Sequence, residues 1–304
     1  MNHNNRYYKQ VQLLMQVLPF VAEQTCFALK GGTAINLFVR DLPRLSVDID
    51  LVYLPMKSRD DALDEIREAL DAISASIVER LTGTQITEAY KNKDDALRLI
   101  VVRNGVQVKI ELSPVLRGTV FKPEVMAVCE AVEDEFGFTE MLVVALPDLY
   151  AGKICAALDR QHPRDLFDVK WLLENEGLTD DIRKALLVYL SSHNRPMAEL
   201  LRPQFKDIES VYSGEFASMT DSEVPLEELL EIRELLVTLI HQGLTANEKN
   251  YLLSFKNRQP DWHLLELDGV SELPAIKWKQ INLSRMADDK HKAAYQKLES
   301  ILGE

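Results

Sequence analysis

The chain has 304 residues, of which 46 % are hydrophobic and 27 % charged, a balance typical of a globular protein with one large or two ordinary domains. The formal net charge of −13 excludes a general attraction to nucleic acid, so any RNA contact would need a local basic patch. No apolar run approaches the ~20 residues that span a bilayer, and the N-terminus lacks the apolar core of a signal peptide. We therefore expect a cytoplasmic protein without membrane contact. The three cysteines form no C-x-x-C pair and indicate neither a zinc site nor a disulfide framework.

The first elements are a helix and a short strand. Apolar residues at helical spacing predict a helix from about Asn5 to Glu23. Because Pro19 interrupts this run, we expect a break or kink near Leu18. The apolar segment Phe27–Lys30 predicts a buried strand.

A glycine pair follows that strand. Gly31-Gly32 predicts a tight turn, after which Thr33 can cap a helix over Ala34–Val39. The next segment, Ser46–Tyr53, alternates apolar and polar residues and predicts a strand with one buried and one polar face.

A long helix and a hairpin come next. Ser58 or Asp60 can begin a helix that reaches about Leu81. Asn104-Gly105 is a strong signature of a two-residue hairpin turn, and it lies between two segments of strand character, Leu97–Arg103 and Val106–Ser113. In that register, Glu111 lies opposite Arg98 and shares the polar face of its strand with Lys109.

The pattern becomes helical after Pro147. Helical spacing predicts five helices, over Leu149–Arg160, Leu166–Glu174, Asp180–Ser191, Leu226–Gln242 and Lys290–Leu302. We predict an α+β protein with a mixed sheet and flanking helices over residues 1–145 and a helical C-terminal domain over residues 146–304. The three tryptophans, Trp171, Trp262 and Trp278, are predicted as core residues and not as base-stacking platforms, with an exposed position as the alternative for Trp262 beside Pro260.

The polar face of the strand Ser46–Tyr53 carries the main chemical signal. Asp48 and Asp50 are two residues apart, so both carboxylates project from one face. Hard oxygen ligands of this kind suit Mg²⁺, with Mn²⁺ as an alternative. Glu111, on another polar strand face, is the candidate third carboxylate of a two-metal site that would act on phosphate. The non-catalytic alternatives are that Asp48 and Asp50 are merely solvated surface residues and that Glu111 forms a surface ion pair with Arg98.

The glycine turn is suited to phosphate. A strand that ends at Gly31-Gly32 and opens a helix exposes backbone N–H groups, and glycine lets a triphosphate approach closely. The segment lacks both the P-loop and the G-x-G-x-x-G pattern. Joined to Asp48 and Asp50 at this spacing, the turn favours an NTP-binding function for Gly31, Gly32 and Thr33.

This combination resembles the nucleotidyltransferases of polymerase-β type and, more closely, the AbiEii/AbiGii and MenT group of nucleotidyltransferase toxins. The resemblance is carried by four segments along most of the chain, namely Leu29–Ala34, Arg44–Leu51, Pro147–Lys170 and Pro274–Leu283. It implies that residues 1–145 form the catalytic domain. It also implies that Lys153 contacts the nucleotide phosphates, that Asp165 adds an acidic residue to the active centre, and that Ser46 belongs to the motif.

The resemblance further implies the toxin of a toxin–antitoxin or abortive-infection pair, with a cognate antitoxin as partner. Several members of the group resemble enzymes that add nucleotides to the 3′ end of tRNA. We expect an Mg²⁺-dependent transfer of NMP from an NTP to an acceptor hydroxyl, with Glu111 or Asp165 helping to deprotonate that hydroxyl. One alternative is an enzyme that transfers the nucleotide to a protein or a small molecule. A second alternative is a catalytically inactive protein that acts by binding a partner.

Several of these residues also have structural interpretations. Lys153 can be a lysine that extends from an apolar helix to solvent, and Asp165 can simply cap a helix that begins at Leu166. We assign Asp168 a structural role. For RNA binding, we predict a basic patch formed by five cations, namely Arg40, Arg44, Lys91, Lys93 and Arg164.

Overall fold

The computed structural model describes residues 3, 5–93, 95–220 and 222–303. They divide into two compact units. Unit 1 comprises Met1–Ala145 together with Ala217–Glu223, and unit 2 comprises Leu146–Phe216 together with Val224–Glu304. The segment 217–223 thus returns to unit 1 after the chain has built much of unit 2.

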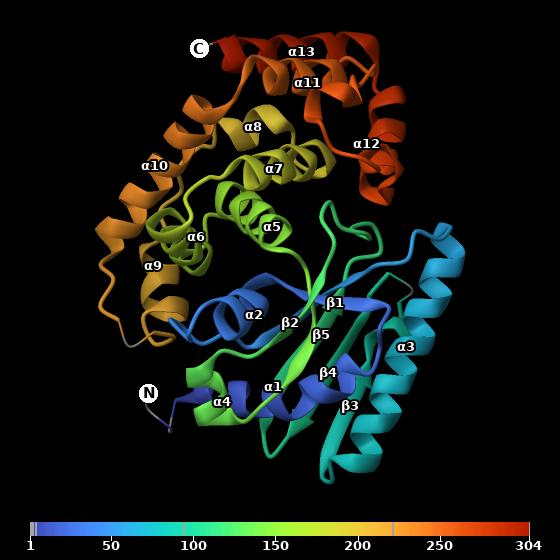
Figure 1. Ribbon diagram of the computed structural model, residues 1–304, viewed down its shortest axis with the longest axis vertical. Coiled ribbons are helices and arrows are strands. Elements are labelled where there is room, and N and C mark those ends of the chain that lie inside the picture. The colour runs from blue at the N-terminus through green and yellow to red at the C-terminus, as the bar shows by residue number, and fades with distance from the viewer. Residues whose placement is uncertain (1–2, 4, 94, 221, 304) are drawn as a thin grey trace. The chain divides into compact units, whose positions relative to one another are not determined.

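Unit 1 is built on a mixed sheet (Figure 1). Seven strands of the described chain lie in the order β3-β4-β5-β2-β1-β7-β6. Their bounds are β1 Phe27–Lys30, β2 Asp48–Tyr53, β3 Thr84–Glu88, β4 Arg98–Arg103, β5 Val106–Leu112, β6 Glu124–Ala127 and β7 Glu140–Val143. The pairs β2–β5 and β1–β7 are parallel, and the other neighbours are antiparallel.

The hairpin between β4 and β5 has the predicted register. Arg103 pairs with Val106, so the turn consists of Asn104 and Gly105. Both turn residues have a positive φ, 50° and 75°, as a turn that matches the twist of its strands requires. The same register places Arg98 opposite Glu111, which confirms the sequence prediction.

Helices cover the sheet of unit 1. α1 (Arg6–Ala22) packs against β5 and β7, α3 (Arg59–Arg80) packs against β3, and α4 (Glu130–Phe136) contacts α1. Ser58 caps α3 by accepting a hydrogen bond from the backbone N–H of Asp61. The predicted break near Leu18 is wrong, because α1 continues through Pro19 to Ala22. Pro19 lies in the last turns of the helix and removes one backbone hydrogen bond, while the burial of Leu18 and Val21 holds the turn in place.

Unit 2 is helical. Its helices are α5 Leu146–Asp159, α6 Pro163–Asn175, α7 Asp180–Ser192, α8 Met197–Leu201, α9 Glu209–Val211, α10 Leu226–Gly243, α11 Ala246–Lys256, α12 Pro274–Ser284 and α13 Asp288–Gly303. α5 packs against α6 and α7, and α12 packs against α7. A mixed sheet in one unit and helices in the other confirm the predicted α+β class.

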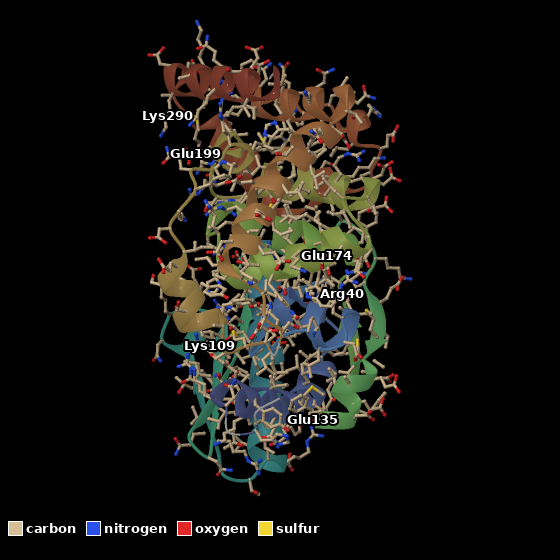
Figure 2. The ribbon with its side chains drawn as sticks, turned by 90° about the vertical axis from the view of Figure 1, so that its left-hand side faces the viewer. Arg40, Lys109, Glu135, Glu174, Glu199 and Lys290 are labelled. Atoms are coloured by element: carbon tan, nitrogen blue, oxygen red, sulfur yellow. The ribbon has the colours of Figure 1, made fainter. Side chains whose placement is uncertain are left out.

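The surface of both units carries many charged side chains, among them Glu135, Glu174 and Lys290 (Figure 2). Over the described residues, no helix is both long and apolar enough to cross a membrane.

Candidate active site

The glycine pair follows β1 without a loop. α2 (Gly31–Ala34) begins directly after Lys30 and continues into a π-helical turn, η1 (Ile35–Val39). Lys30 is the N-cap residue and makes no capping hydrogen bond with its side chain. Thr33 therefore lies inside the helix, and the prediction that it caps the helix is wrong. The helix starts earlier than predicted because Gly31, with φ +75°, turns the chain within one residue.

The hydroxyl of Thr33 ties this helix to the aspartate strand. It donates to the backbone carbonyl of Asp48 at 2.5 Å and lies 3.1 Å from the hydroxyl of Ser46. Thr33 is fully buried and Ser46 nearly so. The two hydroxyls thus fix the position at which β2 begins relative to the glycine helix.

The absence of a side chain at Gly31 and Gly32 makes room for neighbouring polar groups. A Cβ atom on Gly31 would lie 2.6 Å from Oδ2 of Asp50. A Cβ atom on Gly32 would lie 2.7 Å from Nη2 of Arg44 and 2.9 Å from Oγ of Ser46. All three distances are shorter than a Cβ atom tolerates, so a side chain at either position would displace a neighbouring polar group.

Register places the three candidate carboxylates of unit 1 on one face of the sheet. β2 and β5 are parallel neighbours, with Asp50 paired to Glu111 and Asp48 paired to Lys109. Side chains of registered residues point to the same face, and residues two apart in a strand do so as well. Asp48 and Asp50 are half-buried, whereas Ile49 between them is fully buried on the opposite face.

Glu111 is also bound to the neighbouring strand. Nε of Arg98 lies 2.8 Å from Oε1 of Glu111, and both side chains are partly exposed. In the described part of the chain, no group of three or more histidine, cysteine, aspartate or glutamate side chains is arranged to hold a metal ion. The donor set of Asp48, Asp50 and Glu111 is nevertheless all hard oxygen on one face, which is the chemistry that Mg²⁺ requires. The residue types therefore suit the ion, while Glu111 is paired with Arg98 in the structure.

A buried ionic cluster holds the candidate residues of unit 2. Nζ of Lys153, on α5, lies 2.9 Å from Oδ1 of Asp165 and 2.9 Å from Oδ2 of Asp168, both on α6. Arg160 also binds Asp165, through Nε at 2.5 Å and Nη2 at 2.9 Å. Lys153 and both aspartates are buried. The cluster contains two cations and two anions, which balances its charge inside the unit.

Burial by itself raises the pKa of Asp165, but the ammonium of Lys153 and the guanidinium of Arg160 outweigh it and hold that pKa well below its ordinary range. Asp165 does not cap α6. His162 does so, because its ring accepts a hydrogen bond from the backbone N–H of Arg164. The capping interpretation of Asp165 is therefore wrong, and so is that of Lys153 as a lysine reaching solvent.

The predicted basic patch does not form as expected. Arg44 is buried and donates to the backbone carbonyl of Leu45. Lys91 is bound by two carboxylates, those of Asp71 and Glu88. Arg44 therefore cannot contribute surface charge, and the prediction is wrong for this residue, whereas Lys91 is exposed and its charge is offset by the two carboxylates.

Sequence reasoning missed three contributors and misplaced one tryptophan. Arg44 fills the space beside Gly32, Arg160 binds Asp165, and Asn36 donates from Nδ2 to the carbonyl of Gly32 at 2.9 Å. The spacing of four residues between Gly32 and Asn36 was the one available signal. Trp278 is 47 % exposed, so its assignment to the core is wrong.

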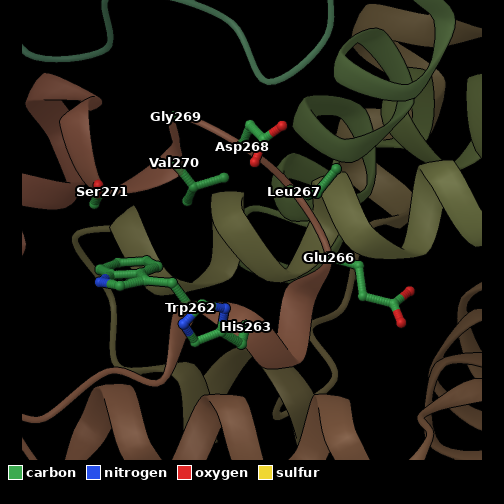
Figure 3. Close-up of a pocket in the computed structure, with 8 residues that line it drawn as sticks. All are labelled: Trp262, His263, Glu266, Leu267, Asp268, Gly269, Val270 and Ser271. Atoms are coloured by element: carbon green, nitrogen blue, oxygen red, sulfur yellow. The ribbon is translucent and has the colours of Figure 1, made fainter.

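A shallow pocket of 270 Å³ lies elsewhere in unit 2 (Figure 3). It is lined by eight residues around two short helices, Trp262, His263 and Glu266–Ser271. None of these eight is a candidate site residue, so the pocket adds nothing to the active site.

Comparison with known proteins places these motifs in a family. The family model of the AbiEii nucleotidyl transferase toxin of type IV toxin–antitoxin systems matches residues 12–276. The search of curated proteins found no match. Among solved structures, the chain is similar to MenT4, a nucleotidyltransferase toxin from Mycobacterium tuberculosis, with a TM-score of 0.60 and 13 % identity over 97 % of this chain and 93 % of that one. At 13 % identity, the likeness to that structure shows the fold alone. The family model covers most of the chain, and the part that it covers includes the glycine turn, the aspartate strand and the α5–α6 cluster. The chain belongs to the AbiEii family of nucleotidyltransferase toxins.

Proposed function

We propose that this toxin transfers NMP from an NTP to the 3′ end of tRNA in an Mg²⁺-dependent reaction, and that a cognate antitoxin restrains it. The observation that carries the proposal is the register of β2 and β5, which sets Asp48, Asp50 and Glu111 on one face beside Gly31. Carboxylates grouped at a phosphate-binding glycine turn suit a reaction at phosphorus. The toxin role and the nucleotidyl chemistry rest on the family, and tRNA as acceptor rests on the resemblance to tRNA-modifying members.

Asp48, Asp50 and Glu111 would hold Mg²⁺, or Mn²⁺ in its place, and the ion supplies charge neutralisation at the α-phosphate. The backbone N–H groups of Gly31 and Gly32, at the start of α2, would donate to the triphosphate. Thr33 and Ser46 keep the glycine helix and the aspartate strand in place through their mutual hydrogen bond.

The reaction is a displacement at phosphorus. The acceptor hydroxyl oxygen bonds to the α-phosphorus, its proton passes to a carboxylate, and the bond to pyrophosphate breaks. Glu111 suits the proton-accepting role better than Asp165, because a pKa far below neutral makes Asp165 a weak base. We infer that Lys153 and Arg160 supply positive charge for the nucleotide phosphates, and that Asp165 holds these two cations in position.

The test combines purified protein, Mg²⁺ and each of four labelled NTPs with total tRNA and, separately, with cell extract. Label in tRNA, lost on addition of EDTA and in Asp48→Asn and Asp50→Asn, is the expected result. Circular dichroism should show that both variants fold. Label in protein or in a small molecule instead would move the acceptor to that class.

The binding-protein alternative makes a different prediction. If no label forms anywhere and the double variant Asp48→Ala, Asp50→Ala remains toxic to cells, the toxin acts without catalysis. The position of Asp50 speaks against that alternative, because a binding surface has no need to keep a half-buried carboxylate against a backbone turn.

A further inference from the structure

A short stretch of unit 2 has a charge opposite to that of the chain. Between Glu272 and Asp288 no acidic residue occurs, while Lys277, Lys279 and Arg285 lie within or at the end of α12. The chain as a whole carries a net charge of −13. An uninterrupted basic segment in such a chain indicates a surface for an anionic partner.

The outer face of α12 adds an aromatic ring to this charge. Trp278 is 47 % exposed and Ile281, one turn further on, is 41 % exposed. Arg285 lies two turns beyond Trp278 on the same face, roughly 10 Å along the helix axis, and is exposed. A large aromatic ring left in water beside cations is uncommon and marks an interaction site.

A second pair of cations comprises Lys279 of α12 and Lys256 of α11. Lys256, the last residue of α11, is 8 % exposed, and no carboxylate in the described residues lies within ion-pair distance of it. Nζ of Lys279 donates to the backbone carbonyl of His193, at the end of α7. Burial first, and then the positive charge of Lys256, lower the pKa of Lys279 to about 8. Two poorly solvated ammonium groups that repel each other are costly until an anion joins them.

Acidic neighbours compensate only part of the charge. Lys277 pairs with Glu272 at 2.7 Å and Arg258 pairs with Asp288 at 3.1 Å. Lys256, Lys279 and Arg285 have no carboxylate partner in the described parts of the chain. The uncompensated cations of α12 are therefore Lys279, next to Trp278 in the chain, and Arg285 at the end of the helix.

We propose that α12 binds the RNA acceptor, with Trp278 stacking on an unpaired base and Lys279 and Arg285 contacting its phosphates. This surface deepens the proposed function and rests on it for the identity of the RNA. Nucleic acid fits better than an acidic protein, because proteins that bind single strands combine aromatic rings that stack on bases with cations that contact phosphates.

The test measures binding of total tRNA without NTP, by filter binding over a series of salt concentrations. Trp278→Ala should weaken binding about tenfold, within the range that loss of one stacked base produces. Trp278→Phe should restore most of it. Arg285→Gln and Lys279→Gln should each lower the slope of log affinity against log salt by about one per lost phosphate contact.

A charge-matched control separates local contact from bulk charge. Lys122, an exposed lysine of unit 1, can be changed to Gln with the same loss of one charge as in Arg285→Gln. Lys122→Gln should leave affinity and salt slope unchanged. Emission of the three tryptophans provides a second readout, because quenching by tRNA should be present in the wild type and reduced in Trp278→Phe.

The proposal is overturned if tRNA affinity and salt slope are unchanged in all the α12 variants. It is overturned as well if those variants keep their tRNA affinity and lose binding to a protein partner. The outcome is distinguishable from failure of the proposed function. If wild-type protein labels no RNA but binds tRNA through α12, the surface stands and the reaction is wrong. If α12 variants label and bind tRNA normally while Asp48→Asn does not label it, the reaction stands and the surface is wrong.

Discussion

The carboxylate of Asp50 rests against the backbone of Gly31, so closely that a Cβ atom on Gly31 would lie 2.6 Å from Oδ2. Gly31 adopts φ +75° at the junction of β1 and α2, directly after Lys30, which is the residue that pairs with Asp50 in the sheet. Backbone conformation and the position of a candidate metal ligand are thereby coupled at one residue.

Gly31→Ala should therefore affect both stability and activity. We expect a loss of about 1–2 kcal/mol in the free energy of unfolding from the left-handed backbone, and a fall in nucleotide transfer on the order of 10²-fold because Asp50 is displaced. Gly83→Ala is the matched control, since Gly83 has φ +78° but nothing within 4 Å of its Cβ position. It should lose similar stability and keep its activity. Equal activity in the two variants would show that Asp50 tolerates displacement.

Substitutions of Glu111 and of Arg98 should have different effects on nucleotide transfer, although the two residues form an ion pair. If Glu111 is the third carboxylate, Glu111→Gln should lower nucleotide transfer by at least about 10²-fold. Arg98→Gln removes only a partly exposed ion pair, so it should cost roughly 0–1 kcal/mol in stability and leave transfer intact. Transfer rates and urea unfolding of both variants provide the measurement. Equal changes of the transfer rate in the two variants would show that Glu111 has only a structural role.

Lys153→Met should destabilise unit 2 strongly. It leaves Asp165 and Asp168 buried with one cation fewer, which costs about 3–5 kcal/mol at pH 7. In the wild type, the depressed pKa of Asp165 contributes stability that is complete above its unfolded value near 3.9 and is lost as pH falls through the folded value. In Lys153→Met the carboxylates protonate at higher pH, so the deficit should narrow as pH is lowered toward 4. Denaturant unfolding at pH 7 and pH 4.5 measures this, and a deficit independent of pH would contradict the ionic origin of the cluster's stability.

Lys279 should give the protein a distinctive alkaline stability profile. Its pKa is lowered to about 8 in the folded state, against about 10.4 in an unfolded chain. Between these values the unfolded chain binds the extra proton, so stability should rise with pH in that window. Comparing wild type with Lys279→Met cancels the titration of other groups. The difference between them should change between pH 7.5 and pH 10, and a constant difference would mean that Lys279 has an ordinary pKa.

Local patterns were sufficient to predict the strands that carry the candidate site. The alternation around Asp48 and the Asn104-Gly105 turn each encode their structure within a few residues, so β2 and the register of Glu111 followed from the sequence. The strand length differed slightly, because β2 begins at Asp48 and not at Ser46.

Contacts between distant residues could not be predicted in the same way. The burial of Arg44 depends on space left by Gly32, and the sharing of Lys153 by two aspartates depends on how α5 packs against α6. Neither has a periodicity that a single sequence displays. The exposure of Trp278 was missed for the same reason, because a tryptophan on a helix is buried or exposed according to which neighbour covers it.

The return of residues 217–223 to unit 1 has a consequence for synthesis on the ribosome. The backbone N–H of Leu45 bonds to the carbonyl of Met219, and the hydroxyl of Thr220 bonds to the carbonyl of Pro43. The loop that leads into the aspartate strand thus lacks these partners until residue 220 has been translated, well after the sheet itself is complete. A nascent chain that ends before residue 220 contains every candidate catalytic residue but lacks these two hydrogen bonds beside the aspartate strand. The toxin is therefore completed late in translation.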